Sequence, residues 1–457
     1  MRSVSFDTAE NKRMYENEAR ALLGAFFPGE EFEITVGDTQ SESFLRVGPG
    51  TDRRSLKKQM YDDLAAISGK SLPWGSLTGV RPVSLVTRIL QSGLSESDAL
   101  EKFMNDYGVS REKAELAMNV ALRQRRILSG IEPHGYSVYL GIPFCPTTCM
   151  YCSFTSYPVG AFGGMVDEYI GALKREIMHT ASFISGTPQS LYIGGGTPTS
   201  IDAGKIDEIL DLLYESFDIG SGTEVTFEAG RPDSITGEKL KVIKRYGIRR
   251  ISINPQTMNQ DTLQLIGRHH TTRQVKEAYY MARDMGFDDI NMDLILGLPD
   301  EGLMEIEHTM DELISLDPDS ITLHALAVKR GSRLNEMLKE KSLSEPEAGV
   351  ASLMYDFASK ALDRAGYLPY YLYRQKRIAD NFENVGYAKE GKFCFYNVIT
   401  MEEVQSVVAL GAGAISKRVY NDPKRPGYIE RCDNVRDIAG YIGRIDEMIE
   451  RKRRLFG

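Results

Sequence analysis

The chain contains 457 residues, of which 42% are hydrophobic, 26% charged and 9% aromatic. This composition excludes a disordered or fibrous protein, and the length allows two or three domains with sizeable cores. With 55 Lys and Arg against 64 Asp and Glu, the formal net charge is −9, which gives no general attraction to nucleic acid or to an anionic membrane surface. We therefore expect neither of them as a partner.

The N-terminal sequence MRSVSFDTAENKRMYENEAR mixes charged residues throughout and lacks the apolar stretch of a secretory signal. No run of about 18 apolar residues occurs in the chain, so membrane insertion is not expected. Five cysteines, three of them within eight residues, indicate a reducing compartment and a metal site rather than disulfides. Together these features predict a cytoplasmic protein.

Residues 1–130 are expected to form a mainly helical accessory domain. A weak α/β start is followed by helical periodicity at residues 52–67, 82–91, 96–107 and 111–128. Little chemistry is visible in this region, and we assign it no role.

The central region, residues 131–335, alternates short β-branched runs with amphipathic segments, which is the pattern of parallel βα units. A complete barrel needs eight such units, whereas an open doubly wound sheet usually carries a phosphate-binding fingerprint after its first strand, where this chain has cysteines. The expected fold class is therefore α/β, with a partial (β/α)6 barrel of TIM type. Its six strands are predicted at residues 137–140, 190–193, 224–228, 250–254, 289–295 and 320–326.

Residues 336–457 are expected to form a C-terminal domain that closes the active site. The region contains a helix predicted at residues 346–365, followed by an aromatic-rich segment at 367–373. The chain ends in RKRRLFG, a basic sequence that is expected to be solvated.

The strongest signal is the loop after the first predicted strand, which carries Cys145, Cys149 and Cys152. Zinc sites usually draw four ligands as two separated pairs, but Cys394 and Cys432 are distant in the sequence and no histidine is near the loop. Three clustered thiolates fit an iron–sulfur cluster better, and the alternative is a chance group of buried thiols. Three ligands for four irons leave one iron open to bind a small chelating molecule.

This CxxxCxxC loop resembles that of the radical S-adenosylmethionine (SAM) superfamily, whose members hold a [4Fe-4S] cluster at the mouth of a partial βα barrel. The resemblance implies that Cys145, Cys149 and Cys152 are the cluster ligands and that the open iron binds SAM. It also implies that an electron from the cluster cleaves SAM to give a 5′-deoxyadenosyl radical, which abstracts hydrogen from the substrate. A reduced flavodoxin or ferredoxin-type protein is the implied electron donor.

Two further motifs resemble the oxygen-independent coproporphyrinogen III oxidase group. They are Tyr139 with the sequence IPFC at residues 142–145, and GGGTPT at residues 194–199. Glycines at a strand end remove Cβ atoms where the polar end of a ligand must approach the backbone, although an ordinary tight turn is the alternative. The resemblance assigns five residues of these motifs and of the cysteine loop to the cofactor site: Tyr139, Tyr151, Gly195, Gly196 and Thr197.

Three polar residues lie in or just after the next predicted strands, near the edge where barrel enzymes place their active sites. Glu228 ends the third strand, Gln256 follows the fourth, and Asp293 lies in the fifth among apolar neighbours. A rim glutamate can also be a helix cap or an ion-pair partner, but a charged residue within a buried strand needs a partner. The resemblance implies that these residues contact SAM, as do the following: Arg268, Ser153 and Phe154.

Phrases along nearly the whole chain resemble the HemZ branch of this group. This resemblance implies a coproporphyrinogen III dehydrogenase, which converts two propionate side chains of its tetrapyrrole substrate to vinyl groups and gives protoporphyrinogen IX. The propionates need fixed cations, and we expect Arg231 and Arg374 to supply them. The phrases are SLTGVRP at 76–82, EAGRPD at 228–233, SINPQTM at 252–258, YLYRQK at 371–376, NVGYAK at 384–389 and LGAGAISK at 410–417.

Two departures from the characterised dehydrogenases leave alternatives open. Those enzymes have a fourth cysteine where this chain has Phe154, and a histidine where it has Gly141. Phe154 instead resembles the haem-trafficking relatives, so a haem-binding chaperone is an alternative. Another tetrapyrrole-directed radical SAM enzyme, such as a methyltransferase or haem degrader, is a third. A haem carrier needs an axial ligand, for which the candidates are His269, His270 and His324.

Overall fold

The computed structural model of the chain consists of two compact units. The smaller unit comprises residues 1–124 with 372–384, and the larger comprises residues 125–371 with 385–457. Most of the region after residue 336 thus groups with the barrel rather than by itself. The structure describes residues 2–27, 30–37, 45–47, 52–79, 81–132, 134–152, 154–328, 332–340, 349–374, 383–421, 424–425 and 427–457.

The smaller unit begins with a three-stranded parallel sheet and continues as helices. Strand β1 (Arg2–Phe6) is central, between β2 (Phe32–Val36) and β3 (Leu45–Val47). Val4, Phe6 and Phe26 are among the residues of its buried core. The predicted weak α/β start and the four predicted helical segments are confirmed. Its helices are α1 (Ala9–Phe26), α2 (Arg53–Ser68), α3 (Val83–Gln91), α4 (Glu96–Tyr107) and α5 (Arg111–Ile127), which ends just beyond the unit boundary.

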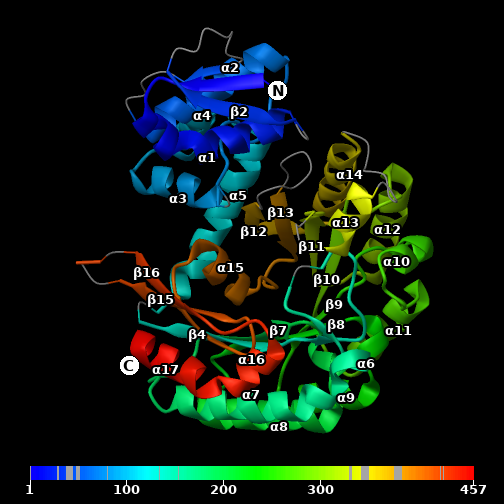
Figure 1. Cartoon of the computed structure of the whole chain (residues 1–457). Helices are drawn as coiled ribbons and strands as arrows, with labels where there is room; N and C mark the ends of the chain where they lie inside the picture. The colour runs from blue at the N-terminus through cyan, green and yellow to red at the C-terminus, as the bar shows by residue number, and fades with distance from the viewer. Residues whose placement is uncertain are drawn as a thin grey trace. The chain divides into compact units, whose positions relative to one another are not determined.

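The six predicted strands of the barrel are all present and parallel, in the order β11-β10-β9-β8-β7-β4. Helices α7 (Val166–Ala181), α8 (Ala203–Ser216) and α9 (Gly237–Arg245) lie along the outer face of the sheet (Figure 1). Helices α10 (Gln260–Leu265), α11 (Thr272–Asp284) and α12 (Leu303–Leu316) follow the later strands. The strands are β4 (Tyr136–Ile142), β7 (Ser190–Gly195), β8 (Glu224–Gly230), β9 (Arg250–Ile253), β10 (Asp289–Leu296) and β11 (Ser320–Ala325).

The C-terminal region extends this sheet at both edges. Strand β14 (Ser406–Leu410) pairs in parallel with β4, with Leu410 opposite Leu140, and continues into the antiparallel strands β15 (Ile415–Tyr420) and β16 (Tyr428–Asp433). At the other edge, β13 (Glu383–Ala388) runs antiparallel to β11, with β12 (Leu368–Arg374) beyond it. The sheet of eleven strands is open, so the barrel is partial as predicted. The helices here are α13 (Arg333–Lys339), α14 (Val350–Arg364), α15 (Phe395–Glu402), α16 (Ile438–Gly443) and α17 (Ile445–Phe456).

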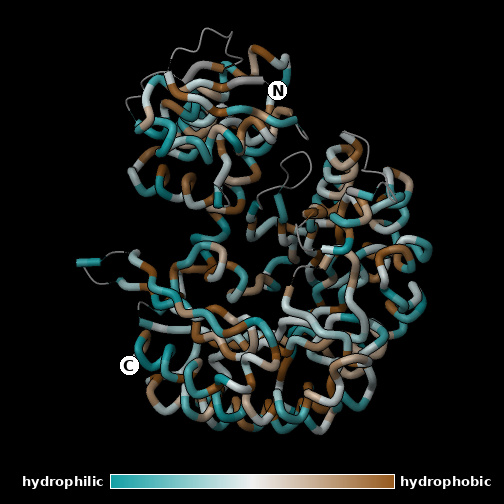
Figure 2. Tube along the Cα trace, viewed as in Figure 1, coloured by the Kyte–Doolittle hydropathy of each residue, from teal (hydrophilic) through white to brown (hydrophobic). Residues whose placement is uncertain are grey.

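Side-chain alternation along the strands separates a helix-covered face from the inside of the barrel. In β7, Leu191 and Ile193 are buried, whereas the ring of Tyr192 stacks on that of Tyr396, with centroids 4.6 Å apart. Hydrophobic residues gather along the inner sides of the elements, and hydrophilic residues along the outer turns of the helices (Figure 2). Within the described ranges, no helix is long and apolar enough to cross a membrane.

The expected solvation of the closing sequence RKRRLFG is wrong for part of it. Residues 451–456 lie in α17, where Lys452 is fully buried and Leu455 is 7% exposed. Hydrophobic residues four apart place one side of the helix against the larger unit, and the basic residues hide that periodicity in the sequence.

Candidate active site

The cysteine loop begins where β4 ends, at the C-terminal edge of the sheet. Cys145 is buried and Cys149 and Cys152 are partly buried, and all three thiols are free. The amide of Cys152 donates to the carbonyl of Cys149 over 3.1 Å, which forms a tight turn. The hydroxyl of Thr147 donates to the carbonyl of Gly267 over 2.9 Å and so fixes the loop to the segment after α10.

Burial governs the protonation of these thiols. It raises the pKa of Cys145 to about 11, and it also raises the pKa of Cys152. Metal ions bind the thiolate, so loading a cluster here releases protons. The thiol of Cys145 also accepts a hydrogen bond of 3.5 Å from the hydroxyl of Thr197.

The glycines at the end of β7 are required by close contacts. A Cβ on Gly194 would lie 2.6 Å from a carboxylate oxygen of Glu228. A Cβ on Gly196 would lie 2.6 Å from the carbonyl oxygen of Phe144 and 3.0 Å from Sγ of Cys145. The carboxylate of Glu228 could rotate away from a Cβ on Gly194, but the backbone oxygen of Phe144 could not move away from one on Gly196. Only glycine at residue 196 therefore lets the chain after β7 approach the cysteine loop.

Glu228 lies inside the barrel among side chains from neighbouring strands. The hydroxyl of Tyr192 donates to its carboxylate. Burial, reinforced by the negative charge of Asp293, raises the pKa of Glu228 to about 7, while the Tyr192 hydrogen bond and His324 act in the opposite direction. With a pKa of about 7, the Glu228 carboxyl group can exist in either protonation state near neutral pH, so it is suited to bind a cation or a hydroxyl group of a ligand.

Asp293 is held by polar neighbours on β10 and β11. The side-chain amide of Asn291 donates to its Oδ1 over 2.8 Å, and Nε2 of His324 lies 3.8 Å from the same atom. Burial alone would raise the pKa of Asp293, but the His324 and Asn291 interactions lower it overall. Asp293 therefore remains an anion inside the barrel.

Arg268 contacts the cysteine loop and Gln256 pairs with β10, and both side chains have unused hydrogen-bonding capacity. Gln256 has a φ of +69°, a left-handed conformation that is strained for a residue with a side chain. Among the described residues, Oε1 of Gln256, Nε of Arg268 and Oδ1 of Asn254 are buried without a hydrogen-bond partner. Burial alone would lower the pKa of Arg268, but Tyr151 and Cys149, which contact it, raise it overall.

These observations fit a cluster and a small cofactor with polar ends. The loop provides three thiols, and the adjacent strand ends provide orphaned donors and acceptors together with carboxylates from two strands. Buried polar atoms without partners are rare in folded proteins and indicate a missing ligand or water. The other two cysteines lie elsewhere. Cys394 contacts Glu224 and Thr226, and Cys432, in β16, lies opposite Ser416 of β15.

The remaining predicted residues differ in their surroundings. Arg231 is buried and donates to both carboxylate oxygens of Asp233, at 3.0 and 2.6 Å, and to the hydroxyl of Thr147 over 2.6 Å. Phe154 is 77% exposed, and Ser153 lies outside the described residues. Tyr139, in β4, stacks on Tyr192 with the ring centroids 6.4 Å apart.

Arg374 lies in the smaller unit, apart in the chain from the loop residues above. It is 3% exposed, donates to the carbonyl of Leu77 over 2.7 Å and lies over the ring of Trp74 at 5.4 Å. Burial lowers its pKa to about 10. Both arginines thus make internal hydrogen bonds, and their role in binding a substrate stays a prediction.

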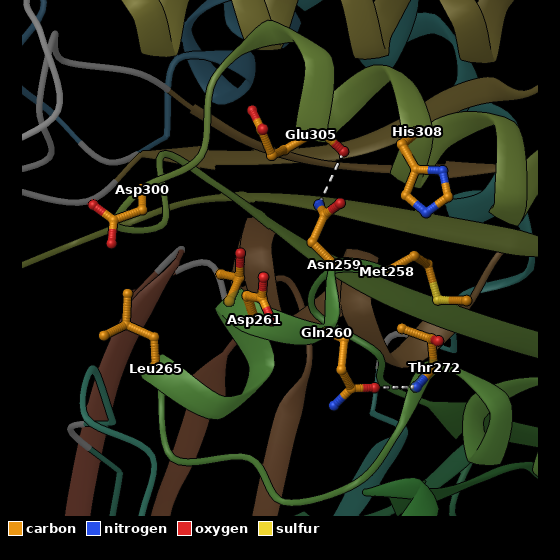
Figure 3. A pocket seen from close by; sticks show the side chains of 10 residues that line it. Met258, Asn259, Gln260, Asp261, Leu265, Thr272, Asp300, Glu305 and His308 are labelled. Atoms are coloured by element: carbon orange, nitrogen blue, oxygen red, sulfur yellow. Dashed lines mark hydrogen bonds between the residues drawn. The ribbon is translucent and has the colours of Figure 1, made fainter.

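A polar pocket of about 740 Å³ lies elsewhere, between α10 and α12. Asn259 donates to the carbonyl of Glu305 across it, and Gln260 accepts from the amide of Thr272 (Figure 3). None of the predicted cofactor residues lines this pocket. We therefore locate the candidate site at the cysteine loop rather than in this pocket.

Comparisons with known proteins decide the family. The profile of the radical SAM superfamily matches residues 139–313, which include the cysteine loop and strands β7 to β10. The chain is 38% identical over 420 residues to the oxygen-independent coproporphyrinogen-III oxidase-like protein HemZ of Bacillus subtilis (strain 168). The aligned residues cover 91% of this chain and 82% of HemZ. The chain belongs to the radical SAM superfamily. The resemblance stated from the sequence is thereby confirmed.

Two other similar proteins place this radical SAM protein further. Heme chaperone HemW of B. subtilis is 30% identical over 315 residues, which cover 68% of this chain and 76% of HemW. The structure of coproporphyrinogen III oxidase (HemN) from Escherichia coli, a radical SAM enzyme, superposes with a TM-score of 0.57 over 72% of this chain and 73% of HemN, at 21% identity. That likeness confirms the fold alone. As a member of the superfamily, the protein uses a [4Fe-4S] cluster and SAM.

Sequence reasoning missed several residues that shape this site. Tyr192, Thr147 and Asp233 bond directly to predicted site residues. Thr147 lies within the cysteine loop and Asp233 ends the phrase EAGRPD, but neither residue is assigned to the site from the sequence, and Tyr192 lies outside the quoted motifs. Tyr192 could have been found from the alternation of side chains along β7, because every second residue of that strand faces the barrel interior. Thr147 and Asp233 have no comparable signal, since their partners are fixed by loop geometry.

Proposed function

We propose that this radical SAM protein is an oxidoreductase of porphyrin biosynthesis. In this proposal each of two propionate side chains of coproporphyrinogen III gives one hydrogen atom to the SAM-derived radical, then loses one electron to an external electron acceptor and its carboxylate as carbon dioxide. Two vinyl groups form without oxygen, and the product is protoporphyrinogen IX. The observation that carries the proposal is the 38% identity to HemZ along 91% of the chain. That similarity extends well beyond residues 139–313, the part of the chain that the superfamily profile matches.

The chain's own residues have defined tasks in this proposal. When bound, the cluster and SAM supply a radical that abstracts hydrogen. Cys145, Cys149 and Cys152 hold the cluster, while Glu228 and Arg268 orient the polar ends of SAM. The barrel positions the substrate and excludes water, since geometry is the main contribution of a fold to cofactor chemistry.

The proposal also includes a place of action and a redox partner. Free thiols at all five cysteines are in keeping with the reducing cytoplasm. A reduced flavodoxin or ferredoxin-type protein is proposed as the electron donor. Besides Glu228 and Arg268, the proposed SAM contacts are Tyr139, Tyr151, Ser153, Phe154, Gly195, Gly196, Thr197, Gln256 and Asp293.

An anaerobic assay with coproporphyrinogen III tests the function. The reconstituted protein is incubated with reductant, SAM and coproporphyrinogen III, and 5′-deoxyadenosine and vinyl products are quantified by mass spectrometry. We expect both products to form together, and neither to form with Cys149→Ala. Formation of 5′-deoxyadenosine without any vinyl product would contradict the proposed reaction. A methylated tetrapyrrole would instead identify a methyltransferase.

A haem chaperone is the second candidate, and two observations favour it. The chain is 30% identical to heme chaperone HemW, and it has Gly141 and Phe154 where the characterised dehydrogenases have histidine and cysteine. Of the three candidate axial ligands, His324 lies inside the barrel with its side chain 27% exposed. His269 is exposed, whereas His270 is fully buried, which lowers its pKa to about 3.

Haem titration distinguishes the two candidates. A chaperone should bind haem stably, with a shifted Soret band that His324→Ala weakens and that the exposed control His308→Ala leaves unchanged. A dehydrogenase should instead turn over coproporphyrinogen III and show no Soret change dependent on His324.

A further inference from the structure

A buried carboxylate in α7 binds four donors from the C-terminal region. Glu176 is fully buried, and its Oε1 accepts from Nζ of Lys452 over 2.6 Å and from Nδ2 of Asn434 over 2.7 Å. Its Oε2 accepts from the amide of Gly411 over 2.8 Å and from the hydroxyl of Tyr441 over 2.6 Å. Every hydrogen-bonding position of this carboxylate is therefore used, although no motif in the sequence includes it.

Tyr169 lies two turns earlier on the same face of α7 and reaches the strand that carries the cysteine loop. Its hydroxyl donates to the carbonyl of Gly141 over 2.7 Å and accepts from the amide of Ala412 over 3.1 Å. Its ring meets the ring of Phe144 edge-on, with centroids 5.4 Å apart. Because Phe144 directly precedes Cys145, Tyr169 connects α7 to the start of the cysteine loop.

The turn at residues 411–414, which follows β14, touches the chain on both sides of the cysteines. A Cβ on Gly411, whose φ is +99°, would lie 2.4 Å from the carbonyl oxygen of Gly141. A Cβ on Gly413 would lie 2.6 Å from the hydroxyl oxygen of Thr155, three residues after Cys152. The turn thus packs against the segments that enter and leave the loop, and both of its glycines are needed for that approach.

The Lys452–Glu176 pair is better explained by positioning than by stability. Both side chains are at most 1% exposed, and removing two charges from water offsets much of their attraction. In proteins, replacing a buried ion pair with hydrophobic residues of similar volume is often neutral or stabilising. The pair instead orients the Glu176 carboxylate so that it accepts from the Gly411 amide. The turn at residues 411–414, fixed in this way, then supports the cysteine loop.

We propose that Glu176 is a positioning residue of the SAM site, which acts together with Tyr169 through the turn at residues 411–414. Glu176 does not itself touch the cofactor in this proposal. It fixes the turn against Gly141 and Thr155, so that the cysteine loop holds the open iron at the right distance from the SAM-binding strand ends. The proposal rests on the family's cofactor and not on the proposed substrate.

Binding of SAM to the oxidised, reconstituted protein tests this proposal, because the cofactor binds in that state without being cleaved. Tyr169→Phe loses the hydrogen bonds to both Gly141 and Ala412. We expect this variant to retain its cluster iron but to bind SAM about two- to tenfold more weakly, which corresponds to the net free energy of about one hydrogen bond. In the apoprotein of this variant, hydrogen exchange at the Ala412 amide should be faster. We expect Glu176→Gln to weaken SAM binding more strongly, since it removes the charge as well.

Tyr246→Phe is the matched control, because the Tyr246 hydroxyl donates to Asp207 over 2.6 Å between outer helices, away from the loop. It should leave SAM affinity unchanged. If Glu176→Gln does not fold, Tyr169→Phe still decides the question. Unchanged SAM affinity in Tyr169→Phe, or an equal loss in Tyr246→Phe, would overturn the proposal. Neither result depends on coproporphyrinogen turnover, so the failure of this proposal is separable from that of the proposed function.

Discussion

Gly196 approaches Cys145 so closely that a Cβ at residue 196 would lie 3.0 Å from the cysteine Sγ. The backbone at the end of β7 therefore packs directly against the cysteine loop. In proteins, such an approach to a metal-binding thiol leaves room for one residue type only.

Gly196→Ala is expected to lose most of its cluster. The added methyl group would lie 2.6 Å from the Phe144 carbonyl oxygen, a backbone atom that cannot rotate away, so the cysteine loop must shift. Iron content per chain and visible absorption after anaerobic reconstitution measure the effect. The control is Gly171→Ala in α7, where no atom lies within 4 Å of the new Cβ; it should keep full iron content. Full iron content in Gly196→Ala would show that the loop tolerates the shift.

Cys149→Ala is expected to abolish cluster binding and SAM cleavage together. Cys432→Ala should keep both cluster binding and SAM cleavage, because Cys432 lies in β16, opposite Ser416 of β15, and not in the cysteine loop. Electron paramagnetic resonance of the reduced proteins distinguishes the two variants. A four-iron signal retained in Cys149→Ala would refute the assignment of this ligand.

Glu228→Gln is expected to change the pH dependence of stability in the apoprotein. Burial raises the pKa of Glu228 from 4.5 to about 7, so its contribution to stability is present below pH 4.5 and is lost as the pH rises through about 7. Glutamine does not ionise, so the variant should be more stable than the parent at pH 8, by at most about 3 kcal/mol, and this difference should shrink at pH 5. Urea unfolding at both pH values measures it. Equal differences at the two pH values would rule out titration as the cause.

Gln256→Gly is expected to stabilise the apoprotein while weakening SAM binding. Glycine removes the strain of the +69° φ, which amounts to about 1 kcal/mol, but it also removes the orphaned amide oxygen. Thermal unfolding and SAM titration are the measurements. Asp218→Gly, at a φ of +50° on an exposed turn, should give the stabilisation without any change in affinity. Unchanged SAM affinity in Gln256→Gly would remove Gln256 from the site.

Arg231→Lys is expected to make the cluster more labile. Lysine retains the charge but cannot bond at once to both Asp233 oxygens and Thr147, so the loop loses a support. The rate of iron loss to a chelator measures this effect. Arg249→Lys is the control, because Arg249 is paired with Asp288 but 69% exposed. If Arg231→Lys keeps a stable cluster and changes only the KM for the tetrapyrrole, substrate binding is its role.

The barrel could be predicted from the sequence because its signals are local. Each predicted strand is a β-branched run between turn residues, and all six have counterparts in the structure. The cysteine motif is local too, so its spacing alone predicts an iron–sulfur loop at residues 145–152, whereas Gly196 is assigned to the site through the family resemblance. The left-handed Gln256 was identified only through the family resemblance, since no propensity predicts strain.

Features that depend on distant segments could not be predicted. The pairing of β14 with β4 joins residues about 270 positions apart, and hydrophobic patterning does not identify such partners. Lys452 was predicted to be solvated, because a basic run usually is; its burial depends on Glu176, on another helix. The division into domains was expected to follow the chain, but residues 372–384 belong to the smaller unit.

The pairing of β14 with β4 has a consequence for biosynthesis. The strand that leads into the cysteines acquires its second neighbour only when residues near the carboxyl end have left the ribosome. Until then, a nascent chain exposes an unpaired strand edge, which is a template for aggregation. Premature termination between Cys152 and Ser406 therefore yields a polypeptide that contains all three loop cysteines but lacks the strand that pairs with β4, and such products depend on chaperones or proteases for disposal.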